Sequence, residues 1–126
     1  MRRLFSSLTA MALLLMPVAA HAASSTSNGQ ISVAQVLEMV SLAKSDPAAR
    51  TTVIAYLAGV GEATGLMMSE AQRRGAERVH CTNSFNLDEN VAVAALSAAA
   101  PDQSVWAETA ATPIIIADMF SRAGCR

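Results

Sequence analysis

His80 and Cys81 stand side by side in the stretch ERVHCTNSFNLDE, at residues 77–89, and their side chains are the ones best suited to chemistry. A thiol next to an imidazole can act as a nucleophile with its base, bind a metal ion, or contribute half of a disulfide. The one other cysteine, Cys125, lies one residue before the end of the chain. Which chemistry applies depends on the compartment in which the chain folds and on the elements that place these residues.

The first 22 residues have the pattern of a secretory signal peptide. Arg2 and Arg3 precede an apolar run that is too short to cross a bilayer as a helix and is broken by Pro17. Small residues at Ala20 and Ala22 occupy the two positions that signal peptidase recognises, so we expect cleavage after Ala22. No cysteine follows to carry a lipid, and no second apolar stretch reaches about 18 residues. The sequence therefore predicts a periplasmic protein with no membrane span in the mature chain.

The composition of the mature chain favours a helical domain and argues against a nucleic-acid partner. Loss of Arg2 and Arg3 leaves seven Lys and Arg against 10 Asp and Glu, and this mildly acidic chain lacks the clustered cations that bind phosphates. About 100 residues suffice for one domain with a modest core. Aromatic residues make up only 4% of the chain, which suits closely packed helices better than a sheet. We therefore expect an all-α fold, a small bundle of about four to five helices.

Residues 32–126 are expected to form a single helical domain after a disordered, polar lead-in at residues 23–31. Ser32 and Gln35 form a capping-box pattern that starts a helix at residues 33–45. The pair Asp46 and Pro47 ends this helix and starts the next one, which runs over residues 47–74 and stops at Gly75.

The second half of the chain is predicted to hold two more helices. Asn86 and Glu89 repeat the capping box before a helix at residues 87–99. Thr112 as cap and Pro113 at the first helical position start the last helix, which reaches about residue 122. Residues 102–112 are left open between a short helical turn and a kinked lead into that helix. The apolar face of the helix at residues 87–99 is expected to comprise Leu87, Val91, Ala94, Ala95 and Ala98.

Three small residues, Ala58, Gly61 and Gly65, share one face of the helix at residues 47–74. A glycine inside a helix costs up to about 1 kcal/mol relative to Ala, so we expect a compensating contact. A smooth strip lets another helix backbone approach closely, and it suits a second copy of the chain as well as a neighbouring helix. Glu62 lies off this strip, either as a solvated residue or as a buried acceptor.

Export favours a disulfide between Cys81 and Cys125, the one intramolecular pairing that the sequence allows. A closed loop of about 45 residues gives on the order of 4 kcal/mol of stabilisation. A catalytic pair of His80 and Cys81 is disfavoured, because adjacent side chains point in different directions. A zinc site would have at most three ligands without a recognised spacing, and no GxSxG, HExxH, CxxC or phosphate-binding loop occurs. We therefore predict a protein without enzymatic activity, metal ion or cofactor, with His80 as a bystander.

Several of these features together resemble the Rap1a/Tai family of type VI secretion immunity proteins. The resemblance covers about residues 50–125 and rests on AYLAGVGEATG at residues 55–65, on the two cysteines, on PDQSVWAE and on IIIADMFSRAGC. Thr82 and Asn83 follow the first cysteine, where the family often has proline. The positions that match the family pattern are Tyr56, Gly59, Glu62, Cys81, Pro101, Trp106, Ala117, Phe120 and Cys125.

The resemblance implies a periplasmic, disulfide-bonded helical protein that binds and occludes a peptidoglycan-cleaving effector, typically an amidase, as a stoichiometric inhibitor. The loops TNSFN and PDQSVWAE supply the candidate partner-binding residues Asn83, Phe85, Gln103 and Trp106. Aromatic side chains are enriched at interface hot spots, although core packing is the alternative for Phe85 and Trp106.

Two other functions fit the same features. The first is a small periplasmic chaperone similar to the HdeA-type acid-stress proteins, which are also helical, exported and held by one disulfide. This function predicts that acid exposes apolar surface. The second is an accessory protein of an envelope secretion or conjugation system. A neighbouring effector gene with an amidase signature would favour immunity, and a conjugation cluster would count against it.

Overall fold

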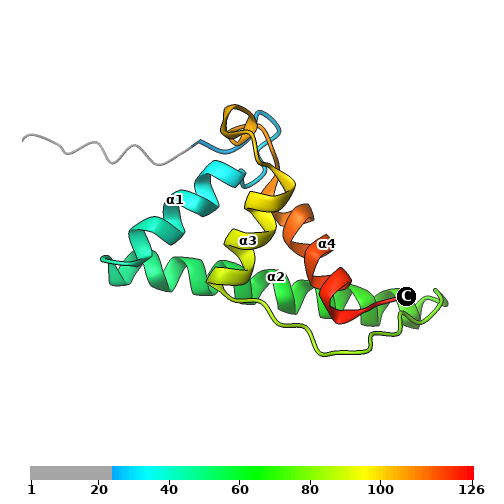
Figure 1. Cartoon of the computed structure of the whole chain (residues 1–126). Helices are drawn as coiled ribbons and strands as arrows, with labels where there is room; N and C mark the ends of the chain where they lie inside the picture. Colours follow the sequence, from blue (N-terminus) through cyan, green and yellow to red (C-terminus); the bar gives the residue numbers. More distant parts are fainter. Residues whose placement is uncertain (1–23) are drawn as a thin grey trace, which may run out of the picture.

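The computed structural model describes residues 24–126, and these residues form four α-helices and one short 3₁₀ helix without a named β-strand (Figure 1). The all-α class and the small bundle with one disulfide are confirmed. The predicted signal peptide, residues 1–22, lies outside the described residues. The elements are α1 (Val33–Ala43), α2 (Pro47–Arg73), α3 (Glu89–Ala99), η1 (Gln103–Val105) and α4 (Ala111–Ala123).

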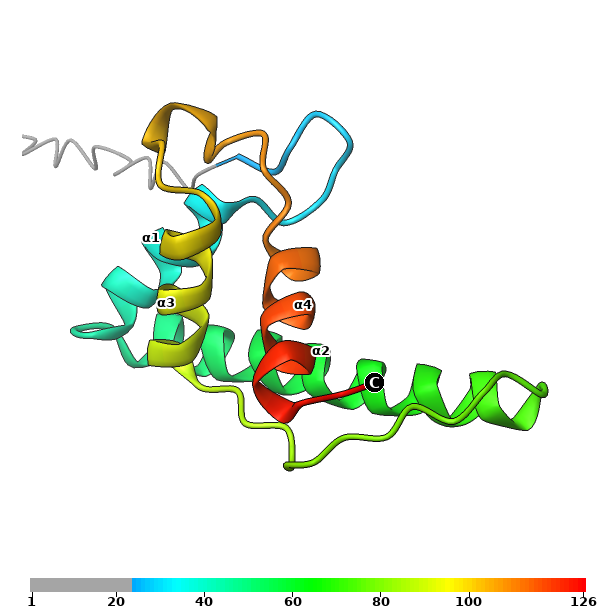
Figure 2. The same cartoon turned by 45° about the vertical axis from the view of Figure 1, so that its right-hand side comes forward.

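The other three α-helices pack against the long helix α2. Its 27 residues span about 40 Å at 1.5 Å per residue. Figures 1 and 2 show α1, α3 and α4 on one side of α2, and all three pack against it. The segment between α2 and α3 turns back and runs alongside α2 (Figure 2). Helix α2 therefore carries a packed side and an open side.

The core lies where the four helices meet. Helix α2 contributes the stripe Val53, Leu57, Val60 and Thr64, which recurs at helical spacing on its packed side. Helices α3 and α4 add their own buried residues to the same cluster. The largest fully buried apolar side chains are Leu96, Ile115, Met119, Val33, Val36 and Val53.

The predicted starts of α1 and α2 are confirmed. The Ser32 hydroxyl accepts a hydrogen bond from the Gln35 amide N–H at 3.1 Å, and the Gln35 side chain accepts from the Ser32 N–H at 3.0 Å. The Asp46 carboxylate accepts from the Ala48 N–H at 2.9 Å, directly before Pro47. Both ends satisfy backbone donors that a helix leaves unpaired.

Helix α3 begins later than predicted, at Glu89, and its N-cap is Asp88, so the Asn86 capping box was wrong. The Asp88 carboxylate accepts from the Val91 N–H at 2.9 Å, which satisfies one of the backbone donors that the first turn leaves unpaired. Leu87 packs against the core, and the Asn86 carbonyl accepts a hydrogen bond from Arg122. Two tertiary contacts therefore hold the residues before α3 in an extended path.

Helix α4 begins at Ala111, and the predicted Thr112 cap with Pro113 at the first position was wrong. The N-cap residue, Ala110, has no side-chain acceptor, and the Ala111 N–H donates to the Ile31 carbonyl at 2.9 Å. Thr112 is inside the first turn, and its hydroxyl meets the phenol of Tyr56. Pro113 falls at the third position, where its missing N–H costs no intrahelical bond.

The lead-in that was expected to be disordered is ordered over residues 24–31. Thr26 is 5% exposed, and its N–H donates to the Gln30 carbonyl at 2.9 Å to close a turn. The Glu108 carboxylate accepts from the Ser27 N–H at 3.0 Å, and this bond lowers the pKa of Glu108. Residues 102–112, which were left open, contain η1 and a turn that pairs with the start of α1. These long-range bonds supply the order that local sequence cannot.

Candidate protein-binding groove between α3 and α4

The cysteine beside His80 forms the predicted disulfide. Cys81 is bonded to Cys125, 44 residues away, and neither is a free thiol. His80 and Arg126 exchange backbone hydrogen bonds at 3.0 and 2.9 Å, so the residue before Cys81 is paired with the residue after Cys125. In residues 24–126 no three His, Cys, Asp or Glu side chains gather where they could hold a metal ion. The disulfide thus attaches the segment between α2 and α3 covalently to the end of the chain after α4.

Asn83 and Phe85, two of the candidate partner-binding residues, serve this attachment. The Asn83 N–H donates to the Ala123 carbonyl at 3.0 Å, and its side-chain amide reaches the Arg122 carbonyl at 3.5 Å. The half-buried ring of Phe85 packs against Phe120 with ring centroids 5.4 Å apart. Both side chains therefore pack against the C-terminal end of α4.

Gln103 and Trp106, the other two candidates, lie in the loop at the opposite end of α3 and α4. The Trp106 indole N–H donates to the Ala100 carbonyl at 2.7 Å, and its half-buried ring packs against the core. The Gln103 carbonyl accepts from the Trp106 N–H at 3.3 Å. Figure 1 shows the two loops at opposite ends of α3, which rises about 16 Å over its 11 residues. The structure does not bring the four candidates together.

The strip of small residues on α2 does not receive a helix, so its predicted packing role was wrong within this chain. Ala58 is exposed, and a Cβ added at Gly61 or Gly65 would meet no atom within 4 Å. The other helices pack on the stripe that contains Val53 and Leu57, about a quarter turn around α2 from the small residues. Glu62 is exposed, which agrees with its reading as a solvated residue.

A hollow with a volume of about 720 Å³ lies between α3 and α4 on the described surface. It is open to solvent and lined mainly by methyl groups. Ala95 is buried and Ile114 half-buried, whereas Ala94, Ala98 and Ala117 form exposed walls. Small side chains on both walls let a partner backbone approach closely, as in helix-in-groove recognition.

Polar groups close one end of this groove. The Arg122 guanidinium donates to the Asp118 carboxylate at 2.7 Å and to the Asn86 carbonyl at 2.7 Å. The side chains of Arg122 and Asp118 are 35% and 30% exposed, so solvent screens the pair only in part. The apolar surface of the groove thus ends in an oriented charge pair.

The sequence interpretation missed the groove because it placed Ala94 and Ala98 on the buried face of α3. The residues that are buried are Ala92, Ala95 and Leu96. An alanine-rich helix has apolar residues on every side, so periodicity alone does not identify its core face. The signal in the sequence that could have identified the core face was the position of Leu96, the largest apolar residue of α3.

Comparison of the chain with protein-family models, with curated proteins and with solved structures returned no match.

One helix also has the length and composition of a membrane span. Helix α2 contains an 18-residue window with a mean hydropathy of 1.2, contrary to the expectation that no such stretch follows the leader. A core helix of a water-soluble protein passes the same test, and α2 supplies the buried stripe of this bundle. Only 22% of the window is buried, so most of α2 is left open.

Proposed function

We propose that the chain is an exported inhibitor that binds and occludes a peptidoglycan-cleaving amidase effector of type VI secretion through the groove between α3 and α4. The observation that carries the binding function is the groove itself, an open apolar hollow that ends in the pair formed by Asp118 and Arg122. The class of partner comes from the resemblance to the Rap1a/Tai immunity proteins, one of whose matching positions, Ala117, lines this groove.

Rigidity of the groove supports an inhibitory role. At one end, the disulfide and the bond from Arg122 to Asn86 hold the last turn of α4 to the segment before α3. At the other end, the Trp106 indole holds the loop between the two helices to the Ala100 carbonyl. A surface ordered before binding loses less conformational entropy when a partner docks, and this favours tight stoichiometric inhibition.

The test is protection of a bacterial host in which a type VI amidase encoded beside this gene is directed to the periplasm. Co-expression of the chain is expected to prevent lysis, and the purified chain to abolish amidase activity at an equimolar ratio. Ala98→Arg places a long cation in the groove and should raise the inhibition constant by about 100-fold or more. Ala55→Arg, at an exposed alanine of α2 outside the groove, is the matched control and should inhibit normally.

Full activity of the amidase in the presence of excess chain would reject the proposal. Equal inhibition by the Ala98→Arg and unaltered chains would place the binding surface elsewhere.

A further inference from the structure

A second hollow lies between the middle of α2 and the start of α3, and it shares no lining residue with the groove between α3 and α4. Its volume is about 430 Å³. Leu57 and Leu87 of this hollow pack in or against the core, whereas Ile54 is 56% exposed. An exposed isoleucine beside core leucines offers an apolar surface to another molecule. We define the α2–α3 hollow by its lining residues: Ile54, Leu57, Ala58, Leu87, Asp88, Glu89 and Asn90.

Carboxylates form the polar side of the α2–α3 hollow. One oxygen of Asp88 accepts the Val91 N–H at 2.9 Å, and the other makes no hydrogen bond within the described residues. The Glu89 side chain makes no hydrogen bond or ion pair in the described part of the chain. Glu62 is exposed and lies about one turn of α2 beyond Ala58. Three carboxylates therefore lie in the hollow or within one helical turn of it.

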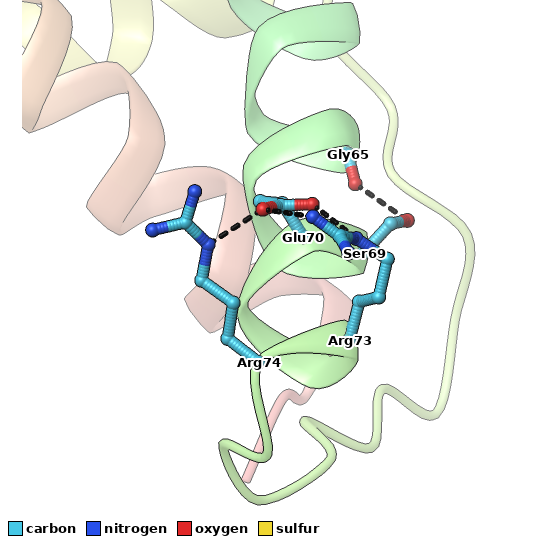
Figure 3. Close-up of polar contacts among 5 residues, drawn as sticks. All are labelled: Gly65, Ser69, Glu70, Arg73 and Arg74. Carbon is cyan, nitrogen blue, oxygen red and sulfur yellow. Dashed lines mark hydrogen bonds and ion pairs between the residues drawn. The ribbon is translucent and has the colours of Figure 1, made fainter.

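The cations of α2 and α3 do not neutralise these carboxylates. Helix α3 contains no Lys or Arg. Arg50 of α2 donates to a backbone carbonyl of α1 at 3.3 Å. At the far end of α2, Arg73 and Arg74 both bond to Glu70 (Figure 3). The N-terminus of α3 carries about half a positive charge, which offsets only part of the charge of two carboxylates. The hollow is therefore apolar with a negative rim.

We propose that the α2–α3 hollow binds a segment of a partner protein in which a Lys or Arg stands next to a large aliphatic residue. The aliphatic side chain covers Ile54 and Leu57, and the cation reaches the carboxylates of Asp88 and Glu89. A Lys or Arg side chain suits this border, because its methylene stem packs on apolar surface while its charge stays at solvent. The side-chain amide of Asn90 can bond to the backbone of the segment.

The charge of the hollow decides between its possible occupants. Nucleic acid and an anionic bilayer are both negatively charged, so the carboxylates would repel them. A small polycation would gain the ionic contacts but would leave Ile54 exposed to water. The predicted mature chain, with seven Lys and Arg against 10 Asp and Glu, adds a long-range attraction for a basic protein. A basic segment with an aliphatic residue satisfies both the apolar floor and the rim.

Nuclear magnetic resonance of the isotope-labelled mature chain, purified from the periplasm, tests the proposal with synthetic peptides. The peptide acetyl-Lys-Leu-Lys-Leu-Lys-amide is expected to shift the amide signals of residues 54–58 and 87–90. Its dissociation constant should be in the millimolar range and should rise with salt, because the ion pairs are exposed. Peptides with Glu in place of Lys, or Ser in place of Leu, should bind at least about fivefold more weakly. No amidase is present, so the result does not depend on the proposed inhibition.

Two pairs of variants locate the contact. Glu89→Gln removes one carboxylate of the rim and should weaken binding of the Lys-Leu peptide by about threefold or more. Glu77→Gln, at an exposed carboxylate outside the hollow, is the matched control and should bind normally. Ala58→Arg fills the hollow with a cation from the chain itself and should abolish binding. Ala55→Arg, at another exposed alanine of α2, should bind normally.

Unchanged amide signals outside residues 54–58 and 87–90 show that each variant keeps its fold. Absence of shifts with the Lys-Leu peptide at millimolar concentration, or shifts centred on another surface, would overturn the proposal. Equal binding by the Ala58→Arg and unaltered chains would do the same. Equal binding of the peptide with Ser in place of Leu, or of spermidine, would overturn it in favour of unspecific attraction of cations.

Discussion

At the scale of single residues, the phenol of Tyr56 is the polar contact that joins α2 to α4. Its oxygen lies 2.9 Å from the Thr112 hydroxyl in the half-buried space between the helices. Burial raises the pKa of Tyr56, and the bond to Thr112 offsets part of this effect. Thr112 was expected to cap α4, and sequence offered no means to see that its hydroxyl faces a tyrosine 56 residues earlier.

Tyr56→Phe should lower the free energy of unfolding by about 1 kcal/mol, because it removes one half-buried hydrogen bond. The pKa of Tyr56 is raised above its usual value of 10.0, so its contribution is complete below that pH and is lost as pH rises through the higher folded pKa. Urea denaturation between pH 8 and about 11 measures both effects. The Phe variant should lose less stability than the unaltered chain above pH 10.

Thr112→Val is the control for this pair, because it removes the same bond from the other helix. The two substitutions together should cost less than the sum of the single ones. Additive costs would show that the hydrogen bond does not contribute.

At the scale of elements, the extent of each helix was predictable where caps are local. Ser32 with Gln35, and Asp46 with Pro47, lie within a few residues of the ends they define, so sequence located those ends correctly. The start of α3 is also capped locally, by Asp88, but the pattern of Asn86 and Glu89 pointed to an earlier start. The start of α4 depends on the Ile31 carbonyl, which lies far along the chain, so no local pattern could place it.

The C-terminal turns of α2 depend on Glu70. Arg73 and then Arg74 lower its pKa, so its ionised form stabilises these turns above the ordinary carboxylate range, and this support is lost as pH falls through the lowered pKa. In the unaltered chain, amide hydrogen exchange in residues 68–74 should therefore accelerate as pH falls toward 3, after correction for intrinsic rates. In Glu70→Gln the protection should already be lower at pH 7 and should change little with acid.

Glu62→Gln is the control for this prediction, since Glu62 has no ion-pair partner within the described bundle. It should leave exchange in residues 68–74 unchanged. Equal protection in the Glu70→Gln and unaltered chains at pH 7 would contradict a role for Glu70.

At the scale of the whole molecule, the disulfide links the segment before α3 to the C-terminus. The number of cysteines in the sequence predicted this bond. Two cysteines in a chain that is predicted to be exported allow one bridge, so Cys81 and Cys125 could be paired without knowledge of the fold. The groove could not be found in this way, because its walls come from two helices whose alanines gave no orientation. The four candidate partner-binding residues were chosen by type, and their folded positions put them at two ends of the bundle.

Removal of the bridge should cost on the order of 4 kcal/mol, from the entropy of the closed loop of about 45 residues in the unfolded chain. Thermal denaturation with and without reductant measures the effect. Reductant should lower the midpoint of the unaltered chain, and the Cys81→Ser, Cys125→Ser double variant should melt at that lower midpoint in either condition. An unaltered chain that melts at the same temperature after complete reduction would contradict this contribution.

The backbone bonds between the start of α1 and the loop before α4 also determine the order in which the chain can fold. The Val33 N–H donates to the Thr109 carbonyl at 2.8 Å, and the Ala111 N–H returns a bond to Ile31. A chain that emerges N-terminus first makes α1 early but cannot complete its first turn until residue 111 has followed. Closure over such a separation adds loop entropy to the folding barrier, so the first turn of α1 and the loop before α4 are expected to become ordered together and late in folding.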